Sequence, residues 1–147
     1  MRLPSLLSVA AALTLPCMAP AIAQDNMPKL VTVITSDDAQ TQLMGMVLTM
    51  QSVKAGASAH MLLCGPGGDL ALKDASDSAT AAQPPMGMSP QGLMQKIMAA
   101  GATVEVCALY LPGKGADAGV LLDSVGVAAP PAMAARLMDA DARVLSF

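Results

Sequence analysis

The sequence KLVTVITSDDAQTQLMGMVLTMQSVKAGASAHMLLC (residues 29–64) contains a complete strand–helix–strand pattern. Its two ends, residues 29–35 and 58–64, are short runs rich in apolar side chains, which is typical of buried strands. Between them, Ser36-Asp37-Asp38 supplies the N-cap of a helix, and Gly56 occupies the position of its C-cap glycine. One apolar face of the predicted helix consists of Leu43, Met46, Val47, Met50 and Val53.

The rest of the chain continues this alternation of strands and helices. A Gly-Pro-Gly-Gly turn at residues 65–68 ends the second strand. The later predicted elements are an exposed loop over 74–85, a helix over 89–101, a strand over 103–111, short helices over 116–125 and from Pro130, and a strand over 143–147. In the last helix, Met133, Leu137 and Met138 are expected to face the core. This order predicts an α/β fold of flavodoxin-like type, with a mostly parallel sheet and helices on both faces.

The first residues have the pattern of a secretory signal peptide. A positive start at Arg2 precedes an apolar run over 6–15, and Ala21-Ile22-Ala23 supplies a cleavage site. The run is shorter than the roughly 20 residues that a membrane span needs. We therefore expect residues 1–23 to be removed, Cys17 with them, and residues 24–147 to form one periplasmic domain without a membrane span.

Composition and missing motifs exclude several classes of function. The formal net charge is −3 and no basic run is present, so nucleic acid is not an expected partner. Trp is absent and Tyr110 and Phe147 are the only aromatic residues, which argues against base-stacking or sugar-binding platforms. No Walker A, GxGxxG or GxSxG motif occurs, and we expect no cofactor. His60 lies in the middle of a predicted strand and is expected to be a packed or edge residue, and Glu105 should share a face with Cys107.

The best single candidate for chemistry is Cys107, near the end of the third predicted strand. Chemistry in open parallel sheets gathers at the carboxyl ends of the strands, where Ser36, Asp37, Cys64 and Lys114 are also expected. A thiolate at this edge is a soft nucleophile that can carry sulfur or be oxidised reversibly, whereas most buried cysteines are inert. Cys64 could pair with Cys107 in an oxidising compartment. If the first strand lies between the second and third, however, the Cα atoms are too far apart for a disulfide.

Short motifs in the second half of the chain point to a family. A helix start at Ser89-Pro90, a helix end at Gly101, a strand leading to Cys107, and Gly115 eight residues later follow one another, with a C-terminal VLSF. In these features, residues 29–147 resemble the DsrE/DsrF-like family of small sulfur-relay proteins. The resemblance implies a compact α/β fold, often assembled as a trimer or hexamer. It also implies that Cys107 occupies the position that carries a persulfide in the relay members.

The thirteen methionines suggest a different function. Met44-Gly45-Met46 falls in a predicted helix, where packing explains it, but Met86-Gly87-Met88 falls in a loop flanked by prolines. Thioethers and thiols are soft ligands that select Cu(I), so Met86 and Met88 could form a copper site with a cysteine. Methionine is also a common filler of cores that are poor in aromatic residues.

Together these observations predict a periplasmic carrier that holds or transfers sulfur through a persulfide on Cys107, and is at most a sulfurtransferase. Its expected partners are a sulfur-donor or acceptor protein or a small thiol, and we expect a homo-oligomer. The alternative is a non-enzymatic binding module, either for Cu(I) or for a partner protein.

Overall fold

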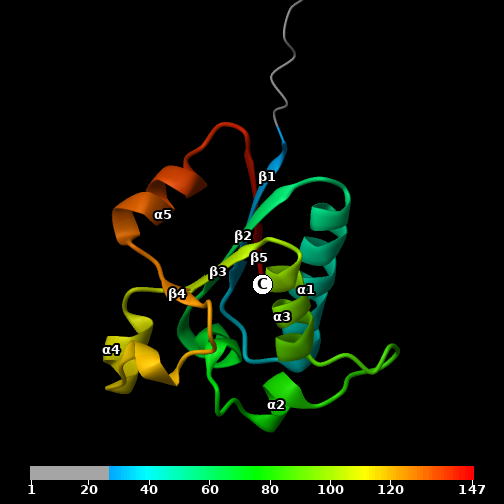
Figure 1. The fold of residues 1–147 in the computed structure, drawn as a ribbon, viewed down its shortest axis with the longest axis vertical. Helices are drawn as coiled ribbons and strands as arrows, with labels where there is room; N and C mark the ends of the chain where they lie inside the picture. Colours follow the sequence, from blue (N-terminus) through cyan, green and yellow to red (C-terminus); the bar gives the residue numbers. More distant parts are fainter. Residues whose placement is uncertain (1–26) are drawn as a thin grey trace, which may run out of the picture.

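The computed structural model describes residues 27–147, and the predicted signal peptide lies outside this range. Five parallel strands form one sheet in the order β4-β3-β2-β1-β5 (Figure 1). The strands are β1 (Lys29–Ile34), β2 (Ser58–Leu63), β3 (Thr103–Val106), β4 (Gly126–Val127) and β5 (Ala142–Ser146). The α/β fold with a parallel sheet is therefore confirmed.

Helices cover the sheet unequally on its two faces. The helices are α1 (Ala39–Lys54), α2 (Asp77–Thr80), α3 (Pro90–Ala99), α4 (Tyr110–Lys114) and α5 (Pro130–Leu137), with 3-10 helices η1 (Gly65–Ala71) and η2 (Ala118–Val120). Helices α1 and α3 pack side by side on one face, and α5 lies against the other (Figure 1). Within residues 27–147, no helix has the length and apolar character to span a membrane.

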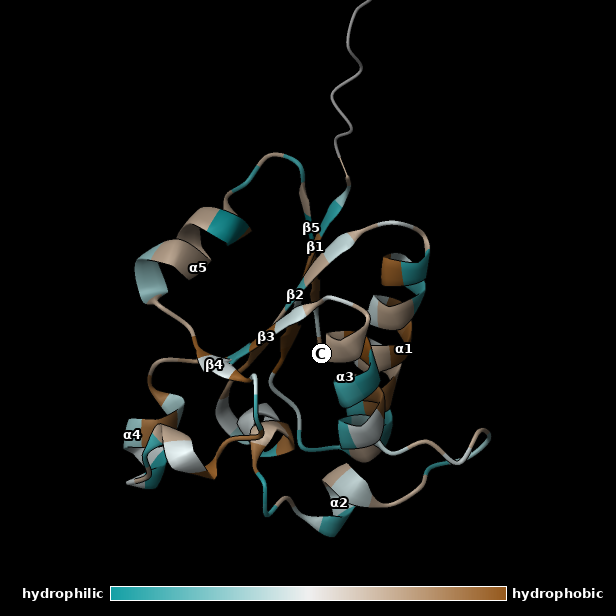
Figure 2. Ribbon diagram, viewed as in Figure 1, coloured by the Kyte–Doolittle hydropathy of each residue, from teal (hydrophilic) through white to brown (hydrophobic). Residues whose placement is uncertain are grey.

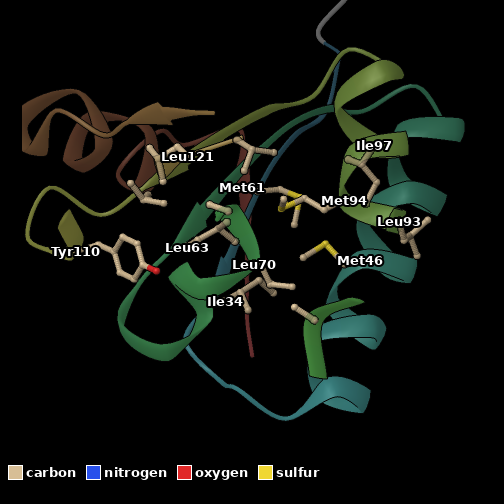
Figure 3. Close-up of a cluster of buried hydrophobic side chains, with 14 of the residues drawn as sticks. Ile34, Met46, Met61, Leu63, Leu70, Leu93, Met94, Ile97, Tyr110 and Leu121 are labelled. Carbon is tan, nitrogen blue, oxygen red and sulfur yellow. The ribbon is translucent and has the colours of Figure 1, made fainter. Parts of the chain in front are cut away.

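The main core lies between the sheet and the pair α1 and α3. Strand side chains such as Ile34, Met61 and Leu63 meet Met46 of α1 and Met94 of α3, and all five are fully buried (Figure 3). In Figure 2 the hydrophobic residues run along the inner strands, as their sequence pattern predicts. Methionine side chains therefore fill a core that has almost no aromatic side chains, and packing explains why these methionines are present.

The buried face of α1 is rotated from the predicted one. Met46 is buried as expected, but Val47 is exposed, and the small or polar residues Gly45 and Thr49 are buried instead. The Thr49 hydroxyl lies 2.7 Å from the Thr32 hydroxyl of β1 and donates to the carbonyl of Gly45 at 2.8 Å. Because these hydroxyls satisfy one another, α1 can pack closely on the sheet through a small, partly polar stripe that hydrophobic periodicity does not reveal.

Several predicted elements after β2 are wrong in extent. The predicted loop over 74–85 contains α2, and the helix expected over 116–125 is only the short η2. The third strand stops at Val106 instead of residue 111, because the chain turns into α4. In α5, Met133 is buried as predicted, but Leu137 and Met138 are exposed. This helix reaches only a small cluster on the sheet, so its last turn has no core to face.

Candidate functional site

The two cysteines of the described chain lie next to each other at the carboxyl edge of the sheet. Cys64 follows β2 and Cys107 follows β3, and these strands are neighbours in which Leu63 pairs with Val106. The amide of Cys107 donates to the carbonyl of Leu63 at 2.8 Å, and the amide of Cys64 to Ile34 at 2.9 Å. The sheet ladder thus continues to both cysteines. Their Cα atoms are 5.1 Å apart, and their sulfurs form a disulfide.

This pairing decides between the two alternatives for the cysteines. Cys64 and Cys107 would be too far apart only if β1 lay between β2 and β3, but β2 lies between β1 and β3. The strand order β3-β2-β1 brings Cys64 and Cys107 to adjacent positions. Cys107 is therefore not a free thiol in this structure but one half of a disulfide with Cys64.

The disulfide lies in the wall of a cleft of about 570 Å³ between η1 and α4. Its other walls come from the turn after Cys64 and from the segment after Cys107. The lining residues are Cys64, Gly65, Pro66, Asp69, Cys107, Leu109, Tyr110, Gly113 and Lys114. Leu109 is 82% exposed, which is unusual for a large apolar side chain, and it lines this cleft. A small molecule or an extended segment of a partner can therefore reach the disulfide.

A polar network holds the two walls of the cleft together. The hydroxyl of Tyr110 donates to Oδ1 of Asp69 at 2.7 Å, and Nζ of Lys114 lies 2.7 Å from the same oxygen. Burial opposes ionisation of Asp69, but the hydrogen bonds from Lys114 and Tyr110 outweigh it and lower the pKa of Asp69. Burial and the Asp69 carboxylate raise the pKa of Tyr110 well above its usual value. At neutral pH the site thus contains an ionised carboxylate between a neutral phenol and an ammonium.

Two glycines explain why η1 can approach so closely. A Cβ at Gly68 would overlap the ring of Tyr110, and one at Gly67 would overlap the carbonyl of Ile34. Only glycine leaves room for these neighbours. The Gly-Pro-Gly-Gly turn predicted to end the strand therefore also forms the surface against which the Tyr110 ring packs.

The other predicted edge residues divide between the cleft and α1. Lys114 lines the cleft as expected. Ser36 and Asp37 do not line it. The Ser36 hydroxyl accepts from the amide of Asp38 at 3.1 Å, and Asp38 caps α1 by accepting from Thr41 at 2.8 Å. The position of Ser36 at the end of β1 is explained by its contact with Asp38, the residue that caps α1.

Met86 and Met88 lie apart from the cysteines. They line a groove with Val47 and Met50 of α1, whereas the cysteines line the cleft beside α4. Met86 is 84% exposed and Met88 is half-buried. Over residues 27–147, no cluster of three or more His, Cys, Asp or Glu side chains is placed to hold a metal ion. The structure does not bring Met86, Met88 and a cysteine thiolate together into one soft site.

Sequence reasoning missed the roles of Asp69 and Tyr110. Tyr110 was available as a signal, since it is the only tyrosine and lies three residues after Cys107. The apolar run continues through Tyr110, so the sequence pattern predicts that it belongs to the strand. Asp69 directly follows the Gly-Pro-Gly-Gly turn, and nothing local distinguishes it from a surface aspartate.

A second polar group lies on the α5 face of the sheet. Nε2 of His60 is 2.7 Å from Oε2 of Glu105 without the geometry of a hydrogen bond, and the two side chains form an ion pair only when the imidazole is protonated. The side chain of His60 is 9% exposed, so its expected packed role is confirmed. Burial and the nearby Arg136 lower the pKa of His60, and Glu105 only partly opposes them. A separate cavity of about 400 Å³ borders His60 and Arg136 near the amino edge of the sheet.

Comparisons with known proteins support the fold alone. Protein MTH1491 of unknown function from Methanobacterium thermoautotrophicum matches with a TM-score of 0.61 at 15% identity, over 81% of this chain and 98% of that one. The ychN protein from E. coli matches with a TM-score of 0.61 at 20% identity, over 82% of this chain and 100% of its own. No protein-family model matches the sequence, and no curated protein matches it. Both likenesses lie below 25% identity, and they show that this chain shares its α/β fold with these two proteins.

Proposed function

We propose that this protein carries sulfur as a persulfide on Cys107, with Cys64 as the partner thiol. One observation carries the proposal: two cysteines from neighbouring strand ends form a disulfide in the wall of an accessible cleft. A purely structural disulfide needs no cleft beside it, whereas a thiol that exchanges sulfur needs access for a donor and an acceptor. The resemblance to small sulfur-relay proteins, and the position of Cys107 within it, point the same way.

The transfer itself needs only the two thiols in their reduced state. The Cys107 thiolate attacks the outer sulfur of a donor persulfide, R–S–SH, to form Cys107–S–SH and release R–S⁻. An acceptor thiolate then removes that outer sulfur and restores the Cys107 thiolate. Alternatively, the Cys64 thiolate attacks the inner sulfur of the Cys107 persulfide, which forms the disulfide and releases HS⁻. The close spacing of the two Cα atoms makes this last step intramolecular.

Cys64 therefore limits the lifetime of the persulfide. When an acceptor is bound in the cleft, sulfur moves to it. Without an acceptor, and where free sulfide is scarce, the Cys64 thiolate returns the protein to the disulfide seen in the structure. The protein acts as a carrier or sulfurtransferase with no bound cofactor, because both steps are exchanges at sulfur.

The proposal is tested by loading the reduced protein. The mature chain is reduced, freed of reductant, treated briefly with inorganic polysulfide, alkylated and measured by mass spectrometry. We expect an added mass of about 32 Da on Cys107, which a thiol reductant removes. Cys107→Ser should abolish the added mass, while Cys64→Ser should keep it and lengthen its lifetime. An adduct that persists in Cys107→Ser, or no adduct in any variant, contradicts the proposal.

We also propose that the chain acts in the periplasm as a closed homo-oligomer, a trimer or hexamer. The predicted signal peptide supports export. Exposed apolar side chains on and near the lightly covered α5 face, including Met138 and Val144, support association with further copies. Light scattering at micromolar concentration tests the assembly, and a uniform monomer would count against it. Fractionation of cells that produce the full chain tests the location.

A further inference from the structure

We infer that the oxidised protein is loaded directly by hydrosulfide, and that the Cys64–Cys107 disulfide is the form that accepts sulfur. The inference rests on the proposed sulfur-carrier function and deepens it by naming inorganic sulfide as the substrate. It requires no preformed sulfur donor such as a persulfide or polysulfide.

The starting point is the chemical state of the two cysteines. Because both sulfurs share one bond, Cys107 is an electrophile in this structure and cannot attack a donor persulfide. Both cysteines are half-buried, and both line the cleft. A nucleophile that enters the cleft therefore meets the disulfide itself, and the identity of that nucleophile decides the product.

Hydrosulfide converts this disulfide to a persulfide in one balanced step. HS⁻ attacks the Cys107 sulfur, the bond between the two cysteines breaks, and Cys64 leaves as a thiolate. The products are Cys107–S–SH and Cys64–S⁻. The sulfide sulfur is oxidised and the Cys64 sulfur is reduced, so the disulfide is the oxidant and no other is needed. An ordinary thiol in the same position gives only a mixed disulfide, which contains no transferable sulfur.

The cleft suits a small anionic nucleophile. Lys114 is the cationic residue of the lining, and the remaining walls near the disulfide include Pro66 and Leu109, which are poor competitors for an anion. Lys114 and Cys64 line the same cleft, and Cys64 is the residue on which negative charge arises as the disulfide breaks. Its ion pair with Asp69 reduces this help, so we expect Lys114 to have a moderate effect on the rate.

The experiment uses the mature protein with its disulfide intact. Oxidised protein without free thiols is mixed with sodium sulfide, without oxygen and with a metal chelator, then alkylated and digested. We expect a Cys107 peptide that carries an alkylated persulfide, about 32 Da heavier than the plain alkylated thiol, and a Cys64 peptide with a plain alkylated thiol. Disulfide that stays intact, disulfide reduced without a persulfide, or a persulfide found on Cys64 instead overturns the inference.

Cys64→Ser provides the matched control for contaminating polysulfide. In this variant Cys107 has no disulfide partner, so sulfide alone cannot oxidise it to a persulfide, but polysulfide can. We expect no adduct with sulfide and an adduct with polysulfide. An adduct from the sulfide solution in Cys64→Ser assigns the loading to polysulfide and overturns the inference.

The role of Lys114 is measured in the same reaction. Lys114→Gln should slow loading by about threefold, with a smaller loss at high salt, because screening already weakens the charge in the wild type. Lys54→Gln makes the same charge change on α1, away from the cleft, and should leave the rate unchanged. An equal loss in both variants contradicts a local role for Lys114.

The two proposals fail in different ways. If reduced protein loads from polysulfide but oxidised protein does not load from sulfide, the carrier function stands and the hydrosulfide inference falls. If neither form acquires a persulfide on Cys107, the carrier function itself falls.

Discussion

The hydroxyl of Tyr110 donates a 2.7 Å hydrogen bond to the carboxylate of Asp69, and this contact joins α4 to η1 across the cleft. The two residues come from segments that follow different strands, one after Cys107 and one after Cys64. Two contacts therefore hold the walls of the cleft together, the disulfide and this phenol–carboxylate hydrogen bond. Reduction of the disulfide leaves the hydrogen bond in place, so the reduced protein should keep the cleft.

The ionisation of Tyr110 reports this contact. Burial and the Asp69 carboxylate raise its pKa, so the native protein should show little tyrosinate absorbance near 295 nm at about pH 10.5, where an exposed tyrosine is largely ionised. Because the unfolded chain ionises first, stability should fall as the pH rises above 10.0, the ordinary tyrosine pKa.

Asp69→Asn serves as the control for this titration. It removes the negative charge while keeping a hydrogen-bond acceptor, so the Tyr110 titration should move towards its usual range. Tyr110 is the only tyrosine and Trp is absent, so the absorbance has a single source. Ionisation of the native wild type at the ordinary tyrosine pKa would show that the contact does not exist in solution.

Reduction of the disulfide should destabilise the fold without unfolding it at room temperature. The bridge joins positions 43 residues apart, and the loop-entropy relation gives a contribution of about 4 kcal/mol. Urea unfolding with and without a reductant measures it. In the Cys64→Ser/Cys107→Ser double variant, the reductant should have no effect. A wild-type midpoint that does not respond to full reduction would contradict the pairing.

The protonation of His60 should weaken the protein in mild acid. Its pKa lies below 6.5 in the folded state, because burial and then Arg136 disfavour the imidazolium. As the pH falls through 6.5, the unfolded chain binds the proton first, so the free energy of unfolding decreases. Urea unfolding between about pH 7.5 and pH 5 should show this fall, and His60→Gln should reduce it.

An NMR titration gives an independent measure of His60. The chain has one histidine, so one set of imidazole signals follows its ionisation. Arg136→Gln removes the neighbouring cation and should raise the pKa of His60. An unchanged midpoint in Arg136→Gln would remove Arg136 as a cause of the shift.

Two methionine substitutions test which methionines are packing residues. Met46 is completely buried, so Met46→Ala should lower the free energy of unfolding by about 2–5 kcal/mol, while Met46→Leu should cost less than about 1.5 kcal/mol. Met86 is 84% exposed, and Met86→Ala should change stability by less than about 0.5 kcal/mol. Urea unfolding measures all three, and equal losses at both sites would contradict the burial difference.

A glycine pair tests the close approach of η1 and α4. Gly68→Ala places a Cβ against the Tyr110 ring and should cost about 1–3 kcal/mol by overpacking. Gly113→Ala, in α4, meets nothing within 4 Å and should be neutral or slightly stabilising. Thermal unfolding compares the two variants. Near-identical midpoints for Gly68→Ala and the wild type would show that η1 and the ring are not in contact.

Elements whose burial follows a local period could be predicted from the amino-acid sequence. The runs at 29–34 and 58–63 are buried strands because they are short, apolar and bounded by turn residues. Ser89 and Pro90 begin α3 as predicted, since the Ser89 hydroxyl accepts from the amide of Gly92 at 3.1 Å. The alternation of these elements along the chain then limits the fold to a parallel α/β sheet.

Which strand ends meet could not be predicted in this way, because it depends on the order of the strands in the folded sheet. Local periodicity reports whether a residue is buried, but it contains no information on the lateral order of strands, which depends on contacts between distant segments. Because β2 lies beside β3, Cys64 and Cys107 form a disulfide instead of two separate thiols. For the same reason Tyr110 leaves the predicted strand: its ring packs on Gly68 and its hydroxyl finds Asp69, 41 residues earlier in the chain.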